Sequence, residues 1–268
     1  MKQLPDFFQL DQYKISPVDV TRMVFHCDPD AIQPDVILMP WWQPDVFGPW
    51  VDGITTITPG ILYEGTFKGK LFSIVRSGIG APQAGDTTLA LGCTPCKRIF
   101  FAGSVGGLRP DVRIGDLMMP AFSYSGDGFC RYLQPGFPTG DCFLERIAPD
   151  EVLSLALSRA ATPLAAEAGT TIHSGPVFCI DSILAQFGRL DYLVTELGCI
   201  GIEMETAAVF KAARLVGIQA AALFSVSDVP VRRQTLYAGR SREEKEHRKE
   251  TRSRILAKAL LDCLYLQG

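Results

Sequence analysis

Two patterns of hydrophobic and polar positions alternate along this chain. Short apolar runs that end in glycine or turn residues predict strands, several of them buried on both faces: DVILMP, KLFSIVRSGIG, RIFFAGSVGG, GDLMMPAFSY, SGPVFCID and AAALFSVSD. Helical periodicity predicts helices between or after them, over 82–93, 149–168, 201–217 and 241–266. The last of these begins in a densely charged run, which is typical of the exposed start of an amphipathic helix.

Alternating strands and helices predict the fold class α/β. We expect a single domain over residues 1–268, with a central mixed, mainly parallel sheet flanked by helices. A chain of 268 residues with 47% hydrophobic content can bury one large core. In such a sheet, ligands are expected at the edge where strand ends meet glycine-containing loops.

Charge and composition narrow the class of partner. The formal net charge is −3 and the pI is near 5.7, so no basic surface is expected for nucleic acid or an anionic membrane. The first residues, MKQLPDFFQLDQYK, lack the pattern of a signal peptide, and no apolar run approaches the roughly 18 residues of a membrane span. The sequence therefore predicts a cytoplasmic protein that binds a small molecule.

The eight cysteines lie mostly inside apolar runs, which is typical of reduced, buried thiols. Cys93 and Cys96 form a single CxxC pair, which could be a redox couple or half of a zinc site. Since no second CxxC or HxxxH completes four ligands, neither a metal nor another cofactor is expected.

A carboxylate stands out in the segment GIEMETAAVFKAARLVG, residues 201–217. On a helix through this segment, Glu203 falls on the polar face with Lys211 and Arg214, whereas Glu205 points to the apolar face. Removing an unpaired carboxylate from water costs several kcal/mol or more, so the fold or a ligand must donate hydrogen bonds to it. A structural ion pair, or a first-turn Glu favoured by the helix dipole, would also account for Glu205.

Three further segments could bind a ligand. The glycine clusters at 78–80 and 103–107 each follow a predicted strand and could let main-chain amides approach an anion or a sugar. Neither is a GxGxxG or GxxxxGK[ST] motif, so a dinucleotide site or P-loop has no support. Ser227 and Asp228 close the last strand, where an acid could face a ligand or simply cap a turn.

Four motifs together carry a family resemblance: IVRSGIGAP, FFAGSVGGLRPDVRIGD, GIEMETAAVF and FSVSD, in this order. From about residue 20 to 268 the chain resembles the nucleoside phosphorylase and nucleosidase family, which includes uridine phosphorylase, hexameric purine nucleoside phosphorylase and methylthioadenosine nucleosidase. The resemblance implies cleavage of the N-glycosidic bond of a nucleoside. It also implies a homodimer or a ring of dimers.

The resemblance implies roles for individual residues. Glu205 would accept hydrogen bonds from the ribose 2′- and 3′-hydroxyls, which would be the donors that its carboxylate needs. Met204 would lie against the sugar. Asp228, after Ser227, would protonate or hydrogen-bond N7 of a purine; a Gln and Arg pair for a pyrimidine was not found. Further candidate contacts implied for the substrate are Ser104 and Gly103 at the nucleophile, Gly80 near the ligand, Ile183 at the base, and His26, which would reach a neighbouring subunit's ribose.

The phosphate site of the family departs most from this sequence. Residues 39–45, MPWWQPD, replace a loop that carries a phosphate arginine in relatives, and Phe101 and Thr58 stand at or near the positions of two more. Each lost arginine forfeits about 1.5–3 kcal/mol of charge-assisted hydrogen bonding. Only Ser104 is kept, so water is somewhat favoured over phosphate as the acceptor.

A hydrolase would need a base to activate water, and Asp45 is the nearest acid, about one position out of register. Its neighbours Trp42, Pro44 and Phe47 predict a carboxyl whose pKa burial raises. Two alternatives stay open. The chain could be a true phosphorylase whose anion site is rebuilt from other arginines such as Arg22, Arg76 or Arg113, or a non-catalytic nucleoside- or base-binding protein.

Overall fold

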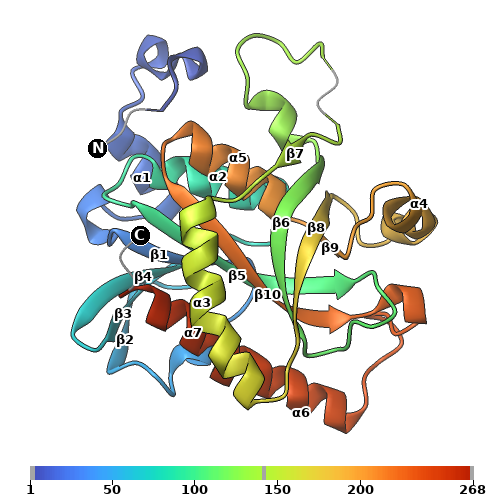
Figure 1. Ribbon diagram of the computed structural model, residues 1–268. Coiled ribbons are helices and arrows are strands. Elements are labelled where there is room, and N and C mark those ends of the chain that lie inside the picture. Colours follow the sequence, from blue (N-terminus) through green and yellow to red (C-terminus); the bar gives the residue numbers. More distant parts are fainter. Residues whose placement is uncertain (1–3, 141–142, 266–268) are drawn as a thin grey trace.

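The computed structural model describes residues 4–140 and 143–265, and a sheet of ten strands with helices on both faces dominates it (Figure 1). The strands are β1 (Asp35–Met39), β2 (Gly53–Thr58), β3 (Leu62–Phe67), β4 (Lys70–Arg76), β5 (Arg98–Gly107), β6 (Leu117–Gly126), β7 (Arg146–Ile147), β8 (Ile172–Ile180), β9 (Gly201–Glu203) and β10 (Gln219–Asp228). All six predicted strands are present. The hairpin β2–β3 and the short strands β7 and β9 were not predicted.

The α-helices are α1 (Pro17–Phe25), α2 (Ala81–Leu91), α3 (Glu151–Glu167), α4 (Leu190–Thr195), α5 (Thr206–Leu215), α6 (Arg242–Glu250) and α7 (Ala257–Cys263). The segment η8 (Thr251–Leu256) is a π-helical turn that joins α6 to α7. Three further short helices named below are the 3₁₀ turns η4 (Pro44–Phe47), η6 (Ala185–Gly188) and η7 (Pro230–Arg232). Capping residues fix where helices begin. At the start of α6, for example, the Ser241 hydroxyl accepts a hydrogen bond from the amide of Glu244.

The sheet is mixed, as predicted. Parallel pairs join β4, β1, β5 and β10, and also β6, β8 and β9. Antiparallel pairs occur in the hairpins β2–β3–β4 and where β10 meets β6 and β5 meets β9. Parallel pairing is therefore less dominant than expected. Because β5 pairs with both β9 and β10, the strands β5, β10, β6, β8 and β9 form a closed ring of paired strands. This half of the sheet is therefore curved rather than open.

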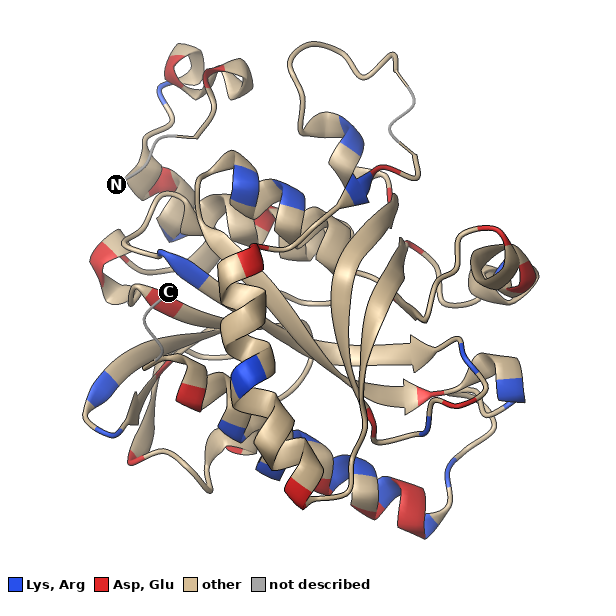
Figure 2. Cartoon of the chain, in the orientation of Figure 1, with Lys and Arg blue, Asp and Glu red and all other residues tan. Residues whose placement is uncertain are grey.

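Two hydrophobic layers cover the sheet. Helices α2 and α5 pack against each other on one face, and α3 packs against α7 on the other (Figure 1). Neighbouring residues of β5 point into different layers: Phe101 belongs to the first and Phe100 to the second, and both are fully buried. Charged residues lie mainly in the helices and in loops around the sheet (Figure 2). Over the described ranges, none of the helices has the length and apolar character needed to cross a bilayer.

Two sequence expectations about local structure are wrong. Residues 201–217 are not one helix, because 201–203 form β9, which pairs with both β5 and β8, and α5 begins only at Thr206. Residues 103–107 do not follow a strand but form the end of β5, paired with β10 and β9. By contrast, the helix predicted over 241–266 is present over 242–263 as α6, η8 and α7; residues 264 and 265 form a turn, and residue 266 lies outside the described ranges.

Candidate functional site

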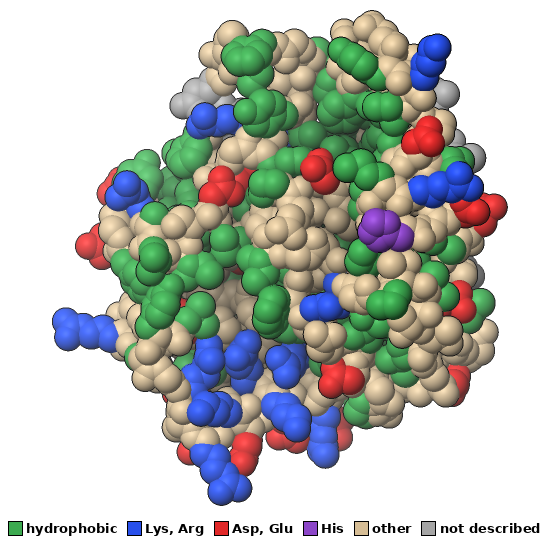
Figure 3. All heavy atoms as spheres, turned by 180° about the vertical axis from the view of Figure 1, so that it is seen from behind, with side chains coloured by type: hydrophobic (Ala, Val, Ile, Leu, Met, Phe, Trp, Pro, Cys, Tyr) green, Lys and Arg blue, Asp and Glu red, His purple; other side chains and the backbone are tan. Residues whose placement is uncertain are grey.

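A pocket of about 480 Å³ opens where the carboxyl ends of the strands converge, at the edge predicted to bind ligands. Strands β5, β8, β9 and β10, the segments after β1 and β4, and the helical segments α6 and η8 all contribute to it. Its lining is Pro40, Trp41, Trp42, Ile79, Ser104, Gly106, Ile180, Ile183, Gln186, Ile202, Glu203, Met204, Glu205, Ser227, Asp228, Leu236, Arg248 and Arg252. Seen from behind, the molecule has a hollow bordered by hydrophobic side chains, with Lys and Arg side chains gathered below it (Figure 3).

Glu203, Met204 and Glu205 form the turn between β9 and α5, and all three line the pocket. The carboxylate of Glu203 accepts hydrogen bonds from the amides of Glu205 and Thr206, both at 2.8 Å, and from the Thr206 hydroxyl at 2.7 Å. It therefore satisfies amides at the start of α5 that have no intrahelical partner. The expectation that Glu203 lies on an exposed polar face is wrong, because the residue ends a buried strand.

Glu205 is 5% exposed and occupies the N-cap position of α5. The amide of Gly80 donates to its Oε1 at 2.8 Å. Gly80 has φ +103°, a conformation that residues with a side chain rarely adopt, so the tight turn 78–80 is what brings this amide to the carboxylate. The main chain thus holds the Glu205 carboxylate, which still lines the pocket, where a ligand can supply further donors.

The two glutamates titrate as a pair. Burial raises the pKa of Glu203, and the charge of Glu205 raises it further. Burial also raises the pKa of Glu205, while hydrogen bonds from the amides of Gly80 and Met204 oppose the shift. Since two like charges so close together repel, the pair holds a proton more readily than an isolated carboxyl group does.

Asp228 ends β10 beside a bulge, where the pairing with β5 shifts by one residue. The hydroxyl of Ser227 donates to its Oδ1 at 2.6 Å. Burial raises the pKa of Asp228, and the Ser227 hydrogen bond, the charges of Arg240 and Arg248 and the amide of Leu236 partly offset this. A carboxyl group with a raised pKa holds its proton more readily than an ordinary carboxyl group and can donate it to a ligand.

Ser104 faces the pocket from β5, and Nη2 of Arg248 lies 3.2 Å from its hydroxyl oxygen. Arg252 lies one helical turn further along, and its guanidinium carbon is 5.3 Å from the centre of the Trp42 ring. Sequence reasoning missed both arginines, because the charged run was expected to be exposed. A signal was present: Arg248, Arg252 and buried Leu256 are spaced by four, so the apolar stripe of α7 continues into the charged run.

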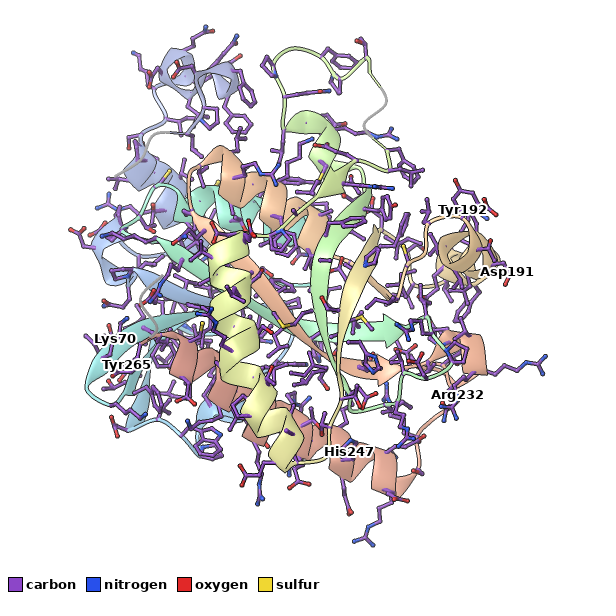
Figure 4. All side chains as sticks on the ribbon, viewed as in Figure 1. Lys70, Asp191, Tyr192, Arg232, His247 and Tyr265 are labelled. Carbon is purple, nitrogen blue, oxygen red and sulfur yellow. The ribbon has the colours of Figure 1, made fainter. Side chains whose placement is uncertain are left out.

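The arginines named from the sequence lie elsewhere. Arg22 pairs with Asp28 on the surface. Arg76 donates to the carbonyls of Trp42, Trp41 and Gly60 at 3.0, 3.1 and 3.2 Å, so its guanidinium stabilises the segment after β1. Arg113 lines a separate open depression of about 790 Å³ with Arg232 and His247, which Figure 4 labels on η7 and α6.

Phe101 and Thr58, which the resemblance places at or near phosphate arginines of the family, are both buried in structural contacts. The Phe101 ring packs edge to face on Phe224 at 5.8 Å between centroids. The Thr58 hydroxyl donates to the carbonyl of Phe25 at 2.8 Å. In the segment that replaces the phosphate loop, Trp42 is 6% exposed and packs inward, whereas Trp41 is 68% exposed and borders the opening.

Four predicted site residues lie outside the pocket lining: Gly80, which is joined to it by the hydrogen bond from its amide to Glu205, and Asp45, Gly103 and His26. Asp45, on η4, is exposed, so the expectation that its carboxyl is buried is wrong. Gly103 faces the opposite side of the sheet, where an added Cβ would lie 3.3 Å from the rings of Phe101 and Phe224. His26, at the end of α1, is exposed. Ile183 does line the pocket, as does the buried amide of Gln186 on η6, which the sequence had not indicated.

Comparisons with known proteins agree with this architecture. The model of the Phosphorylase superfamily matches residues 51–262. A DeoD-type purine nucleoside phosphorylase of Clostridium perfringens is 28% identical over 62% of this chain and 67% of its own length, and one of Pasteurella multocida is 26% identical over 72% and 80%. The fold resembles a uridine phosphorylase of Vibrio fischeri (TM-score 0.71, 20% identity, 89% of this chain and 95% of that one) and a purine nucleoside phosphorylase of Toxoplasma gondii (0.69, 19%, 88% and 93%).

Proposed function

Because the chain belongs to the Phosphorylase superfamily, we propose that it cleaves the N-glycosidic bond of a purine-type nucleoside. The observation that carries the proposal is the presence of Glu205 and Asp228 in one pocket of about 480 Å³, a volume in the range of small-molecule sites. One carboxyl group can serve the sugar and the other the base. The DeoD-type relatives are purine nucleoside phosphorylases by name, which supports the choice of a purine.

At the sugar, the carboxylate of Glu205 accepts hydrogen bonds from the ribose 2′- and 3′-hydroxyls. Its position is set by the Gly80 amide, and Met204 lies against the same part of the pocket. As the bond from C1′ to the base breaks, positive charge develops on the sugar. A fixed carboxylate beside the ribose stabilises that charge without having to reorganise.

At the base, Asp228 donates a proton to the leaving purine. The bonding electron pair of the C1′–N bond departs with the base, and protonation at N7 neutralises the charge that it carries. The burial of Asp228 favours the protonated form that can donate, and the short contact with Ser227 orients its carboxyl group. Ile183 and the amide of Gln186 border the same pocket and are our candidates for contacts with the purine.

The acceptor is a separate choice between water and phosphate. Asp45, the expected base for water, is exposed and outside the pocket lining, which weakens the case for hydrolysis. Two arginines line the pocket beside Ser104, which strengthens the case for phosphorolysis. In that reaction an oxygen of phosphate bonds to C1′ as the base leaves, and ribose 1-phosphate is the second product.

Base release from inosine, guanosine, adenosine and uridine tests the proposal, with and without phosphate, and with the sugar product identified. We expect release from purine nucleosides far exceeding release from uridine. Preference for uridine would contradict the purine assignment. Binding of nucleosides without release of any base would support the alternative of a non-catalytic binding protein.

Assembly as a homodimer or a ring of dimers is part of the same proposal. It would give a role to His26, which is exposed at the end of α1 and could reach a neighbouring subunit's ribose. Light scattering measures the mass of the assembly in solution and so distinguishes a monomer, a dimer and a ring of dimers. A monomer that cleaves nucleosides at full rate would separate this part of the proposal from the chemistry.

A further inference from the structure

We infer that Arg248 and Arg252 form, with Ser104, a binding site for a phosphate-type oxyanion in this pocket. The anion site itself does not depend on the proposed function. Only the statement that a nucleoside binds beside the anion rests on it. Both arginines come from the C-terminal helical segment, in a charged run that shares no motif with the phosphate loops sought in the sequence. The site therefore replaces the lost arginines from a different element.

Unpaired donors on two arginines of the pocket lining are the first observation. The Nε atoms of Arg248 and Arg252 are inaccessible to solvent, and neither has a hydrogen-bond partner within residues 4–140 and 143–265. Leaving a buried donor of a charged group unpaired costs free energy, so native proteins rarely keep such donors without a partner. Both arginines line the pocket, so an anion bound there can pair with their guanidinium groups.

Uncompensated charge is the second observation. Burial lowers the pKa of Arg248 to about 10, and the nearby charges of Arg240 and Arg252 contribute, with Asp228 as the opposing negative charge. Burial also lowers the pKa of Arg252, and only the charge of Asp45 offsets this. An oxyanion between the two guanidinium groups would stabilise both, and guanidinium is the side chain best suited to bind phosphate oxygens in pairs.

The local backbone is the third observation. The π-helical turn η8 follows α6 directly and carries Arg252 on its second residue. Such turns are rare and occur often at functional sites. The contact with the Trp42 ring holds the Arg252 guanidinium but leaves its Nε without an acceptor. A purely structural role for Arg252 thus accounts for the ring contact and not for the unpaired donor.

The hydroxyl of Ser104 adds an uncharged donor to the site. It lies 3.2 Å from Nη2 of Arg248, on the strand that also carries Gly106 past the carboxyl group of Asp228. An anion at Ser104 is therefore close to where the nucleoside would be bound. Two oxyanions share the required chemistry: free inorganic phosphate, and the 5′-phosphate of a nucleoside monophosphate.

Binding of inorganic phosphate without nucleoside, measured by isothermal titration calorimetry on the full chain, tests the site. We expect Arg248→Gln and Arg252→Gln each to weaken phosphate binding by about tenfold or more, because each removes a charge-assisted hydrogen bond. The matched control is Arg254→Gln, since Arg254 lies in the same segment but is exposed and paired with Glu250 at 3.3 Å. It should bind phosphate as the parent protein does.

Circular dichroism checks that the variants fold, and Arg248→Lys, which keeps the charge, should bind more tightly than Arg248→Gln. Assays with nucleosides and with nucleoside monophosphates distinguish the two sources of the oxyanion. If free phosphate is the ligand, base release from a nucleoside accelerates with phosphate and yields ribose 1-phosphate. If the ligand is a 5′-phosphate, nucleoside monophosphates bind more tightly than nucleosides and inorganic phosphate competes with them.

Equal phosphate affinity in the parent, Arg248→Gln and Arg252→Gln proteins would overturn the site. So would the absence of binding of both phosphate and nucleoside monophosphate at millimolar concentration. These outcomes are independent of the proposed function, because phosphate binding is measured without nucleoside. Arginine-dependent phosphate binding without cleavage of any nucleoside would uphold the site and contradict the proposed reaction.

Discussion

The two ends of the pocket are built in different ways. At the end proposed to bind the sugar, Glu205 is held by the main chain: it occupies the N-cap position of α5, and the amide of Gly80 donates to its carboxylate. At the other end, Arg248 and Arg252 reach the pocket on long side chains from a helix that is remote in the sequence from the strands around it. Main-chain positioning depends on a local motif, whereas side chains from a helix can be exchanged between elements without changing the sheet.

This difference explains why a protein can keep its sugar site and change its anion site. Moving Glu205 would require changing β9, the start of α5 and the turn at Gly80 together, and both Glu205 and Gly80 are buried. Adding or removing an arginine on α6 or η8 requires only that the side chain point inward. We therefore expect substitutions at the sugar and base end to have the largest effects, and substitutions at exposed positions near the acceptor end the smallest.

Asp228→Asn should have the largest effect on turnover. It removes the proton donor for the leaving base while keeping the size of the side chain, and general acid catalysis contributes about 10²–10⁴-fold. We expect kcat for a purine nucleoside to fall by about that factor, with little change in the binding of the free base. Steady-state kinetics over the pH range 5–9 measures this. A variant that keeps more than a tenth of the parent rate at every pH would show that Asp228 is not the acid.

Glu205→Gln should come next. It replaces the charged acceptor for two ribose hydroxyls by a neutral amide, and hydrogen bonds to charged groups contribute about 1.5–3 kcal/mol each. We expect kcat/KM to fall by about 100-fold, and nucleoside binding to weaken far more than binding of the free base, which has no hydroxyls. Calorimetry with both ligands makes the comparison. Equal losses for nucleoside and base would contradict the assignment of Glu205 to the sugar.

The sequence predicted these two residues better than it predicted their setting. Glu205 was singled out by a helical pattern over 201–217, yet β9 and a turn occupy the first five positions, and Glu203 is buried as well. The helical interpretation failed because β9 has only three residues, too few to produce a strand pattern, and is stabilised by pairing with two distant strands. What identified Glu205 correctly as a pocket residue was the motif.

Long strands were predicted well because each is a continuous apolar run with turn residues after it. The ring formed by β5, β10, β6, β8 and β9 was not predicted, since pairing between distant strands is a property of the whole fold. The pocket arginines were missed because charged runs are usually exposed. In this chain Arg248, Arg252 and Leu256 are spaced four residues apart, so the two arginines point inward with the leucine. They line the pocket only because this helix lies over the ends of the strands.

Glu203→Gln should have a smaller effect, visible mainly in pH dependence. The raised pKa of Glu203 means that the folded protein holds the proton more tightly than the unfolded chain, whose Glu titrates near about 4.3. Its contribution to stability is therefore full below that pH and is lost as the pH rises through the folded-state pKa. In the Glu203→Gln protein, the free energy of unfolding should therefore fall less steeply as the pH rises. The slope should differ from that of the parent by on the order of 1 kcal/mol per pH unit within that window.

Urea unfolding of the parent and Glu203→Gln proteins at several pH values between 5 and 8 measures the two slopes. The same variant removes a negative charge beside Glu205, so Glu205 should ionise at lower pH and the acid limb of the profile of kcat/KM should move to lower pH. A structural role for Glu203 in capping α5 would lower stability equally at all pH values. Identical slopes in the two proteins would therefore separate capping from charge repulsion.

Asp45→Asn should have the smallest effect and most directly tests the contrast between the two ends of the pocket. Asp45 is exposed and outside the pocket lining, and exposed substitutions usually change free energies by no more than about 0.5 kcal/mol. We expect base release to stay within about threefold of the parent, with or without phosphate. Because the charge of Asp45 opposes that of Arg252, its removal should if anything tighten phosphate binding slightly. A loss of about 100-fold in phosphate-independent cleavage would instead identify Asp45 as the base that activates water, and would favour hydrolysis over phosphorolysis.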